Sequence, residues 1–248
     1  MKVLKKIKFI LFLLFLFSFK SEDSLILKWN FNNFNKLTYD YTQTVLNNSS
    51  VFGKQKVVSS GIIEIITNKS KDKASITLKM AQIKTFDIDN NGKETDSSDF
   101  REYPDFVIGN LTNDGNYEEA ENPQTKHLMR VLFPIANKEL KLLEAYDLPL
   151  RFQYNYFTNK IVVNGFNRII YWGNETLKTE INVSQNTDTK LKKEFEAFLI
   201  GNSNYRFDKQ KNYYKEADIY FNMNLSKKQD KFFMNSENNI NMKLKSVE

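Results

Sequence analysis

Residues Leu148–Ser184 carry the clearest strand pattern in the chain and read LPLRFQYNYFTNKIVVNGFNRIIYWGNETLKTEINVS. From Leu150 to Tyr156, apolar or aromatic side chains occupy every second position, and the alternation returns from Leu177 to Val183. Successive side chains of a strand point to opposite faces, so a period of two predicts strands with one buried face and one wet face. The polar breaks between these runs are short, which predicts an antiparallel meander.

Similar patterns surround this meander. Leu25–Phe31 and Leu37–Val45 alternate on either side of a polar stretch, 32–36, and together predict a hairpin, followed by a polar loop at 47–56. Further strand patterns occupy 62–66, 74–88, 219–225 and 240–244. We therefore predict a mainly β protein, in which residues 24–248 form one domain. Its expected architecture is a long, curved antiparallel sheet or half-barrel with at most one or two short helices.

Two local irregularities interrupt the strand pattern. The apolar stripe that begins at Ala74 changes phase between Met80 and Ala81, and such a slip would exchange the two faces unless a β-bulge absorbs it. Residues 87–92 read DIDNNG, like the start of an EF-hand calcium loop. The twelfth position is Ser98, which cannot supply the bidentate carboxylate that the ion needs. We predict a bulge at the first place and a turn at the second.

Three regions depart from the strand pattern altogether. A long polar connection runs at about 96–122, with one brief strand expected near 106–108. Asn122-Pro123 is typical of a helix start, and it precedes a short apolar helical face that contains His127, the one histidine of the chain. Residues 187–200 fit helical spacing as well as strand alternation, and we expect a strand there from about residue 193.

The amino-terminal residues have the composition of a secretory signal. Lysines precede an apolar run of eleven residues, Phe9–Phe19, which is too short for a bilayer crossing of about twenty residues. We predict a signal peptide at residues 1–20 with cleavage near 18–21, and export to the periplasm or the exterior without a stable transmembrane anchor. The chain has no cysteine, so the prediction excludes a lipoprotein as well as disulfides.

The positive charge does not indicate a nucleic-acid partner. The formal net charge is +6, but five of the 36 basic residues lie in the first twenty residues, where there is no acidic residue. The remainder is close to neutral and lacks the clustered basic footprint that phosphate binding requires. We predict no nucleic-acid binding.

A resemblance to uncharacterised exported bacterial β-rich proteins extends over scattered motifs. In those proteins an L-[RK]-[WY]-x-F strand turns into a Y-x-[YL]-x-Q strand, and this chain has LKWNF at 27–31 and YDYTQ at 39–43. Similar motifs are LFP at 132–134, YRFD at 205–208 and ADI at 217–219. The resemblance implies a curved antiparallel sheet, similar in outline to the LolA/LolB type of periplasmic lipoprotein carrier, and it supplies no catalytic residues.

The abundance of Phe and Tyr (21 and 12 residues) favours a hydrophobic ligand. A half-closed sheet with an aromatic concave face can hold a lipid or an acyl chain. We expect Phe152, Tyr154, Tyr156 and Trp172 to line that face and contact the ligand. If the sheet encloses no cavity, these side chains are core residues and nothing more.

Two other classes of function are alternatives to a non-enzymatic lipid-binding envelope protein. The polar connection at 96–122 would suit a structural or adhesive module that presents loops to an envelope protein. An enzyme is disfavoured because the motifs of nucleophile elbows, zinc proteases, phosphate loops and dinucleotide folds are missing. Asp87, Asp89, Glu118 and Glu119 lie in turn or loop patterns, so a hydrolase that draws carboxylates from separate strands is the weaker alternative. No metal or cofactor is predicted.

Overall fold

A computed structural model describes the chain except for residues 1–22, 90, 97–100, 119–122, 158 and 187–188. The predicted signal peptide, residues 1–20 with cleavage near 18–21, lies outside the described residues. Neither helix in the described part of the chain has the length and apolar content that crossing a membrane requires.

Most described residues belong to β-strands. The strands are β1 (Ser24–Leu27), β2 (Lys36–Ser49), β3 (Gly53–Thr67), β4 (Lys73–Ile88), β5 (Glu94–Asp96), β6 (Arg101–Tyr103), β7 (Phe106–Thr112), β8 (Tyr117–Glu118), β9 (Lys138–Lys141), β10 (Ala145–Tyr156), β11 (Asn159–Gly173), β12 (Thr176–Asn186), β13 (Phe195–Asp208), β14 (Tyr213–Lys227) and β15 (Phe233–Val247). The helical elements are the 3₁₀ helix η1 (Phe31–Asn33) and the α-helices α2 (Pro123–Leu132) and α3 (Thr189–Glu194).

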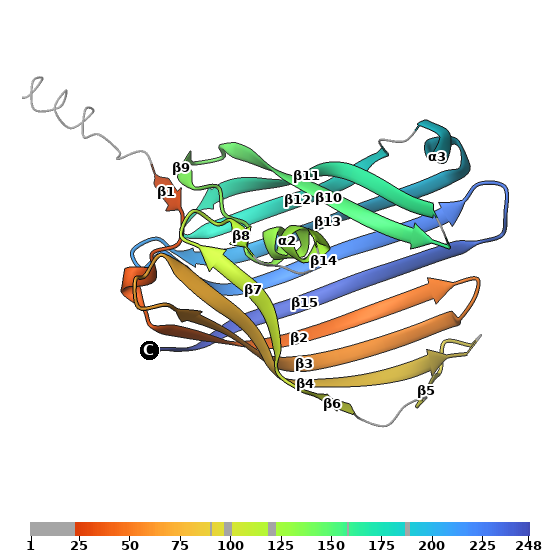
Figure 1. Cartoon of the computed structure of the whole chain (residues 1–248), viewed down its shortest axis with the longest axis horizontal. Helices are drawn as coiled ribbons and strands as arrows, with labels where there is room; N and C mark the ends of the chain where they lie inside the picture. The colour runs from red at the N-terminus through yellow and green to blue at the C-terminus, as the bar shows by residue number, and fades with distance from the viewer. Residues whose placement is uncertain (1–22, 90, 97–100, 119–122, 158, 187–188) are drawn as a thin grey trace, which may run out of the picture.

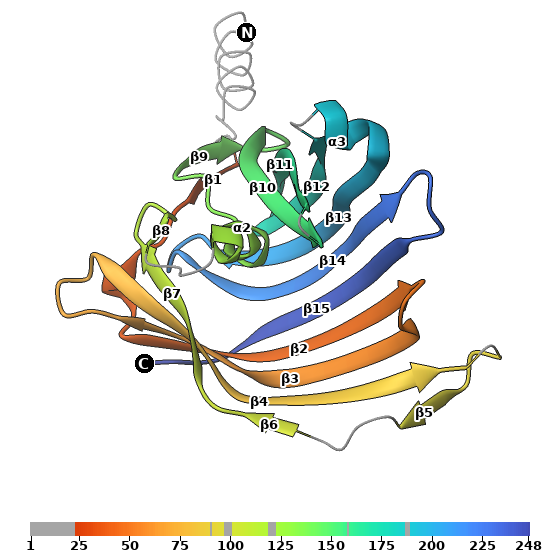
Figure 2. The ribbon, with the colours of Figure 1, turned by 45° about the vertical axis from the view of Figure 1, so that its right-hand side comes forward.

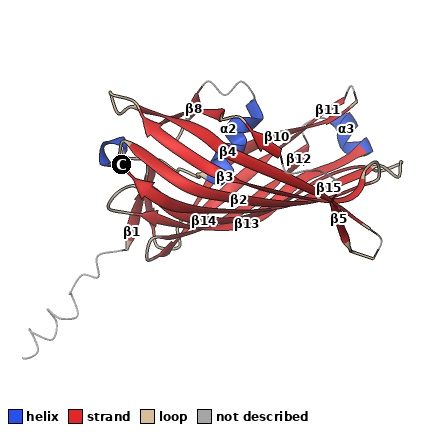
Figure 3. Cartoon of the chain, turned by 90° about the horizontal axis from the view of Figure 1, so that it is seen from below, coloured by secondary structure: helices blue, strands red, loops and turns tan. Residues whose placement is uncertain are grey.

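Thirteen of these strands form one antiparallel sheet in the order β10-β11-β12-β13-β14-β15-β2-β3-β4-β7-β8, with β5 and β6 also paired to β4. The sheet curves strongly without closing into a barrel, so the predicted half-barrel is confirmed (Figure 2). Its long strands run in the long direction of the molecule, and most turns gather at the two ends (Figures 1 and 3). A separate two-stranded ribbon is made by β1 and β9.

The predicted meander is confirmed as β10, β11 and β12, three consecutive antiparallel neighbours. Buried side chains alternate along each strand, as in Leu148, Leu150 and Phe152 of β10 and Ile169 and Tyr171 of β11. Because the inner face of the curved sheet is the buried one, the period of two in the sequence reports which side chains point inward.

The predicted bulge is confirmed between β3 and β4. Ser60 pairs with Gln82 and Ile62 pairs with Lys79, so two residues of β4, Met80 and Ala81, lie opposite the single residue Gly61. A Cβ atom at Gly61 would lie 2.9 Å from the carbonyl oxygen of Lys79, and only glycine allows this approach. Because of the bulge, the apolar side chains from Ala81 onward return to the inner face of the sheet, and the strand bends locally.

The predicted turn at 87–92 is also confirmed. Asp89 Oδ1 accepts hydrogen bonds from the backbone N–H groups of Asn91 and Lys93, at 2.9 and 2.8 Å. Gly92 has a positive φ of 80°, which suits glycine. The turn joins β4 to β5, which runs back along it.

The predicted first hairpin is wrong. β1 pairs with β9, whereas β2 pairs with β15 and β3. The chain leaves the β conformation after Leu27 and forms η1, whose first turn is capped by Asn30 Oδ1 at 3.1 Å from Asn32 N. Trp29, Phe31 and Phe34 are buried within this connection, so burial of aromatic side chains overrides the turn that its polar residues suggest.

The long polar connection at 96–122 contains more structure than the one brief strand expected. In its described part lie β6, β7 and β8, and β7 pairs with both β4 and β8. β7 contains the apolar residues 106–108 of the expected strand, whereas β6 and β8 are very short and largely polar, so hydrophobic alternation gives no sign of these two. Backbone pairing to the edge of the sheet defines them instead.

The predicted short helix is confirmed as α2. The pattern of residues 187–200 fits a helix as well as a strand, and the segment contains one of each. α3 ends at Glu194 and β13 begins at Phe195, close to the expected start of the strand near residue 193. Helical spacing and strand alternation therefore describe successive parts of the segment.

One half of the inner face is filled by segments that leave the sheet. Trp29 packs against Phe133 and Tyr214, with ring centroids 5.9 and 5.7 Å apart, and Phe133 also packs against Tyr39 at 5.8 Å. We call this half, which is packed with η1, α2 and residues 133–136, the filled end. The curved sheet wraps around these segments (Figure 2).

Polar side chains of the sheet hold α2 in place. The last carbonyl groups of a helix have no partner within the helix and must be satisfied from outside. Here two carbonyl groups of the last turn accept hydrogen bonds from the inner face of the sheet: Arg130 O from Asn167 Nδ2 at 3.1 Å and Val131 O from the Tyr205 hydroxyl at 2.5 Å. Just beyond the helix, Pro134 O accepts a hydrogen bond from the Tyr214 hydroxyl. The helix is therefore a bound part of the core.

α2 also covers the free edge of β10, which is the strand at one edge of the sheet. His127 Nδ1 accepts a hydrogen bond from the backbone N–H of Arg151 at 3.2 Å, and the Arg130 guanidinium donates to the carbonyl of Pro149 at 2.8 Å. Unpaired backbone groups at a sheet edge otherwise invite pairing with another chain. His127 thus has a structural contact at the rim of the sheet.

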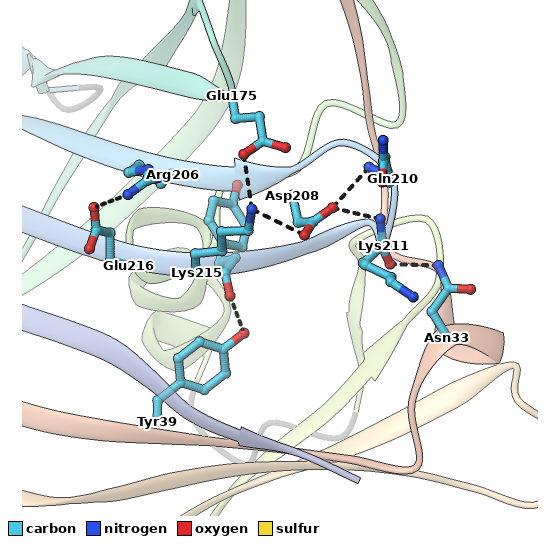
Figure 4. Close-up of polar contacts among 10 residues, drawn as sticks. Asn33, Tyr39, Glu175, Arg206, Asp208, Gln210, Lys211, Lys215 and Glu216 are labelled. Atoms are coloured by element: carbon cyan, nitrogen blue, oxygen red, sulfur yellow. Dashed lines mark hydrogen bonds and ion pairs between the residues drawn. The ribbon is translucent and has the colours of Figure 1, made fainter.

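Polar networks fix the turns at the filled end (Figure 4). Lys215 Nζ lies 3.0 Å from Glu175 Oε2 and 3.1 Å from Asp208 Oδ2, and the hydrogen bond to Glu175 raises the pKa of Lys215. Burial opposes ionisation of Asp208, but hydrogen bonds from the backbone N–H groups of Lys211 and Gln210 and from Lys215 hold its pKa below the usual value. The β13–β14 turn is therefore tied to the β11–β12 turn.

Candidate ligand-binding site

The other half of the inner face contains a pocket of about 410 Å³. Its lining comes from strands and turns that surround the end away from α2: Asn47, Ser49, Phe52, Gly53, Gln55, Gln153, Tyr154, Asn155, Met223, Leu225, Met234, Asn235 and Ser236. We call this half, bounded by the β2–β3, β10–β11 and β14–β15 turns, the open end. A pocket of this size falls within the range of about 300–1,000 Å³ that is usual for small-molecule sites.

The lining residues mix apolar and neutral polar side chains, and apolar atoms form the larger part of the pocket surface. Met223 and Leu225 occupy alternate positions of β14 and point inward, and Met234 enters from the neighbouring strand β15. Methionine is flexible and polarisable, so it adapts to ligands of different shape. Among the described residues that line the pocket, none carries a charge. The pocket therefore suits an apolar ligand.

Tyr154 forms the wall that faces these side chains from β10. Its hydroxyl donates a hydrogen bond to the carbonyl oxygen of Phe198 on β13, at 2.6 Å. Burial raises the pKa of Tyr154, which keeps the phenol neutral in ordinary buffers. The bond fixes the ring as an aromatic wall and spans from the edge strand to an interior strand.

A polar network continues the pocket along the inner face. The Tyr41 hydroxyl donates to Gln43 Oε1 at 2.6 Å, Gln43 Nε2 donates to Asn238 Oδ1 at 3.0 Å, and Asn238 Nδ2 donates to Ser236 at 3.2 Å. Burial raises the pKa of Tyr41 to about 12. Since Ser236 lines the pocket, neutral hydrogen-bonding groups are available on this side for the polar end of a ligand.

Aromatic contacts bring the turns of the open end together. The ring of Tyr156 lies 5.1 Å from that of Phe195 and 4.5 Å from that of Phe232, and Phe232 precedes β15. Backbone bonds join the next pair of turns, since Ser50 N donates to the carbonyl of Phe233 at 3.0 Å. The turns that bound the pocket therefore form one connected structure.

The structure separates the four side chains that the sequence proposes for the concave face. Phe152, Tyr154 and Tyr156 share the inner face of β10, as the alternation predicts. Phe152 is buried toward α2, with its ring 6.2 Å from that of His127, so it belongs to the filled end. Tyr154 lines the pocket and Tyr156 lies in the aromatic cluster beside it. Of the four, Tyr154 is the one in the pocket lining.

Trp172 does not lie on the concave face, and that expectation is wrong. Tyr171 is fully buried, so its neighbour on β11 points to the convex side, where Trp172 is 51% exposed and Lys178 Nζ lies 4.1 Å from the centre of its ring. Residues 169–172 read IIYW and are apolar at every position, so this part of the strand contains no alternation that would reveal which residues face inward.

Sequence reasoning missed most of the pocket lining. Met223 and Leu225 belong to a strand pattern that is visible in the sequence, although no signal distinguishes them from core residues. Asn47, Ser49 and Gln55 fall in the expected polar loop 47–56, where β2 and β3 in fact continue to a tight turn. These inward side chains are polar, so hydrophobic alternation stops before the strands do.

Two shallower hollows, of about 400 and 450 Å³, lie among outward-facing side chains. The larger is lined partly by Phe166, Ile200 and Tyr220, and also by the charged side chains of Arg168 and Glu180. Both are more open than the inner pocket and are not enclosed between opposed parts of the sheet. The inner pocket is therefore the better candidate for binding an apolar molecule.

The described residues offer no site that points to catalysis or metal binding. No cluster of three or more His, Cys, Asp or Glu side chains among them is arranged to hold a metal ion. Glu64 is a buried carboxylate, but Lys36 and Lys79 each place Nζ 2.9 Å from it, and these contacts lower its pKa. These three side chains form a structural ion network on the convex face.

These features define the class of protein by its structure: an open, curved antiparallel sheet, filled at one end and holding an uncharged pocket at the other. No protein-family model and no curated protein matches the chain.

Among solved structures, the chain is similar to lipovitellin, studied for lipid–protein interactions, at 10% identity and a TM-score of 0.48. The match covers 86% of this chain, which spans a quarter of the lipovitellin chain. A protein provisionally described as an outer membrane protein of Bacteroides fragilis matches at 10% identity over 83% of this chain and 96% of its own, with a TM-score of 0.16. Both TM-scores are below 0.5, so the function proposed below rests on the site alone.

Proposed function

We propose that the chain is an exported, non-enzymatic envelope protein that binds a lipid acyl chain or another hydrophobic small molecule in the pocket of the open end. The observation that carries the proposal is the uncharged pocket of about 410 Å³ among Tyr154, Met223, Leu225 and Met234. Each methylene group transferred from water into such a pocket contributes about 0.8 kcal/mol, so a short acyl segment suffices for measurable affinity. The signal-like amino-terminal sequence supports export.

The architecture is also consistent with a binding role. The filled end provides a rigid base of packed aromatic rings, whereas the pocket is lined by side chains that adapt easily, such as methionine. Neutral amides and hydroxyl groups, among them Gln55 and Ser236, can accept or donate to a polar head without requiring a charge. These properties favour a carrier with loose selectivity over an enzyme site with fixed catalytic geometry.

The test is binding of a fluorescent fatty acid to the purified mature chain, together with native mass spectrometry after gentle purification. We expect saturable uptake, and bound species of lipid mass. A matched pair of variants on β15 locates the site: Met234→Trp fills the pocket and should weaken uptake at least tenfold, whereas Phe233→Trp, at the adjacent outward position, should not. The two positions are similarly exposed, at 44% and 37%. A uniformly ligand-free mass without any uptake would overturn the proposal.

A second candidate, the interaction module, is favoured by one observation. Phe106 and Val107 on β7 are strongly exposed, which is unusual for adjacent large apolar residues and is typical of contact surfaces. In this case, shortening residues 96–105 or replacing Phe106 and Val107 by serine would abolish pull-down of an envelope protein without changing fatty-acid uptake.

A further inference from the structure

The turns around the mouth of the pocket expose large apolar side chains. Phe52 in the β2–β3 turn is 72% exposed and Phe157 after β10 is 90% exposed, and Val51 and Phe233 are exposed beside them. Phe52 also lines the pocket, and the ring of Phe157 lies 4.8 Å from that of Tyr156. We call residues 50–54, 156–157, 159–160, 189–194 and 227–234 the turn rim. These segments gather at the end of the molecule away from β1 and β9 (Figure 1).

The turn rim is one connected surface. Two hydrogen bonds join the β2–β3 and β14–β15 turns: Ser50 N donates to Phe233 O at 3.0 Å, and Phe233 N donates to Ser50 Oγ at 3.1 Å. α3 joins them through Lys228, whose N–H donates to Glu194 O at 2.8 Å and whose Nζ donates to Lys192 O at 3.0 Å. Tyr156 connects the β10–β11 turn to the same group through its contact with Phe232.

The turn rim is also strongly basic. Its sequence contains two acidic residues, Glu194 and Asp230, and many more basic ones: Lys54, Lys160, Lys190, Lys192, Lys193, Lys227, Lys228 and Lys231. Within the rim, Asp230 pairs with Lys227 at 2.5 Å, and in the neighbouring β4–β5 hairpin Glu94 pairs with Lys56 at 2.8 Å, which leaves the other rim lysines in excess over carboxylates. An excess of lysine around exposed aromatic side chains is complementary to a surface that is anionic outside and apolar beneath.

We propose that the turn rim docks onto an anionic lipid bilayer, with Phe52 and Phe157 entering the interface and the lysines contacting the headgroups. The inference rests on the proposed function in one respect: docking in this orientation presents the pocket mouth to the lipid from which it loads. Phenylalanine and valine side chains at the turn tips contribute through burial in the headgroup region, and the lysines contribute through attraction to the anionic surface.

The test measures co-sedimentation of the full mature chain with phosphatidylcholine vesicles, with and without phosphatidylglycerol, at low and high salt. We expect binding that needs phosphatidylglycerol and weakens as salt screens the charges. Two variants should each weaken vesicle binding at least tenfold. The aromatic variant combines Phe52→Ser and Phe157→Ser. The lysine variant combines Lys192→Gln, Lys193→Gln, Lys228→Gln and Lys231→Gln.

Controls come from the other end of the molecule. Leu142→Ser with Leu143→Ser removes exposed apolar side chains there, and Lys69→Gln with Lys211→Gln removes exposed lysines, and neither should change vesicle binding. Binding that ignores phosphatidylglycerol, or that survives both rim variants, would overturn the inference. So would sedimentation showing that the turn rim instead joins two copies of the chain.

Uptake of a fatty acid from solution separates this inference from the proposed function. The rim variants leave the pocket strands in place, so the lysine variant should keep normal uptake while losing vesicle binding. Vesicle binding without any uptake would support docking and overturn the pocket as a lipid site. Uptake without vesicle binding would support the pocket as a lipid site and overturn docking.

Discussion

The filled end and the open end are built from the same strands but use their inner faces differently. On β2, the inner residue Tyr39 is buried in the filled end, whereas Asn47 on the same face lines the pocket. On β14, Tyr214 and Met223 show the same contrast. The sheet therefore determines which side chains point inward, while segments that leave the sheet determine whether the interior is filled.

The two ends also differ in their charges. At the filled end, lysines lie beside carboxylates of other segments, as in Lys138–Glu144 at 2.8 Å and Lys215–Glu175 at 3.0 Å. The turn rim has a large excess of lysines over carboxylates in its sequence. Charges that are neutralised within the molecule stabilise turns, whereas an unbalanced patch attracts an external partner. The contrast separates an end whose charges are paired within the fold from one whose excess of lysines supports the proposed docking.

Removing an aromatic ring from the filled end should produce the largest effect. Phe133 is 1% exposed and packs against Trp29, Tyr39 and Tyr214, so Phe133→Ala leaves a cavity in the core. We expect a loss of about 3–5 kcal/mol in the free energy of unfolding, measured by urea denaturation. Phe52→Ala at the open end is the control and should change stability by no more than about 0.5 kcal/mol. Equal losses in both variants would contradict the division into two ends.

Removing a tyrosine hydroxyl should give an intermediate effect that again depends on the end. In Tyr205→Phe, the carbonyl of Val131 loses its buried donor, which should cost about 1–3 kcal/mol of stability. In Tyr154→Phe, the hydroxyl bound to Phe198 O is lost from a partly exposed site, and we expect about 1 kcal/mol or less. Thermal unfolding of the two variants side by side measures the difference, and a greater loss in Tyr154→Phe would contradict it.

The sequence predicts the sheet well because burial on one face imposes a period of two on most long strands. The bulge at Met80–Ala81 is predictable for the same reason, since a change of phase in the apolar stripe must be absorbed somewhere. Where both faces of a strand are apolar, as beside Trp172, the pattern no longer indicates which side chains point inward.

The pocket is harder to predict than the sheet. Its lining mixes polar and apolar side chains because it is not fully buried, so the alternation fades where the cavity begins, as at Asn47 and Gln55. The pairing of β1 with β9 joins segments more than a hundred residues apart, and beside it Trp29, which follows β1, packs against Phe133, which precedes β9. Local turn chemistry contains no information about such a contact.

The smallest expected effect concerns the ion pairs of Glu64 with Lys36 and Lys79, whose contribution to stability should depend on pH. Hydrogen bonds from Lys36 and Lys79 lower the pKa of Glu64 in the folded state, so its ionisation favours folding. This contribution is fully present above the unfolded pKa of about 4.3 and is lost as the pH falls through the lower folded value. Both lysine partners are partly exposed, so we expect Glu64→Gln to cost about 0.5–1 kcal/mol near neutral pH.

The difference between Glu64→Gln and the unmodified chain should then shrink as the pH falls below about 4. Urea denaturation at several pH values measures it. Lys79→Gln removes one of the two partners of Glu64 and should show a smaller loss with the same pH dependence. A loss that stays constant between neutral and acidic pH would show instead that packing of the Glu64 side chain, and not its charge, stabilises this part of the sheet.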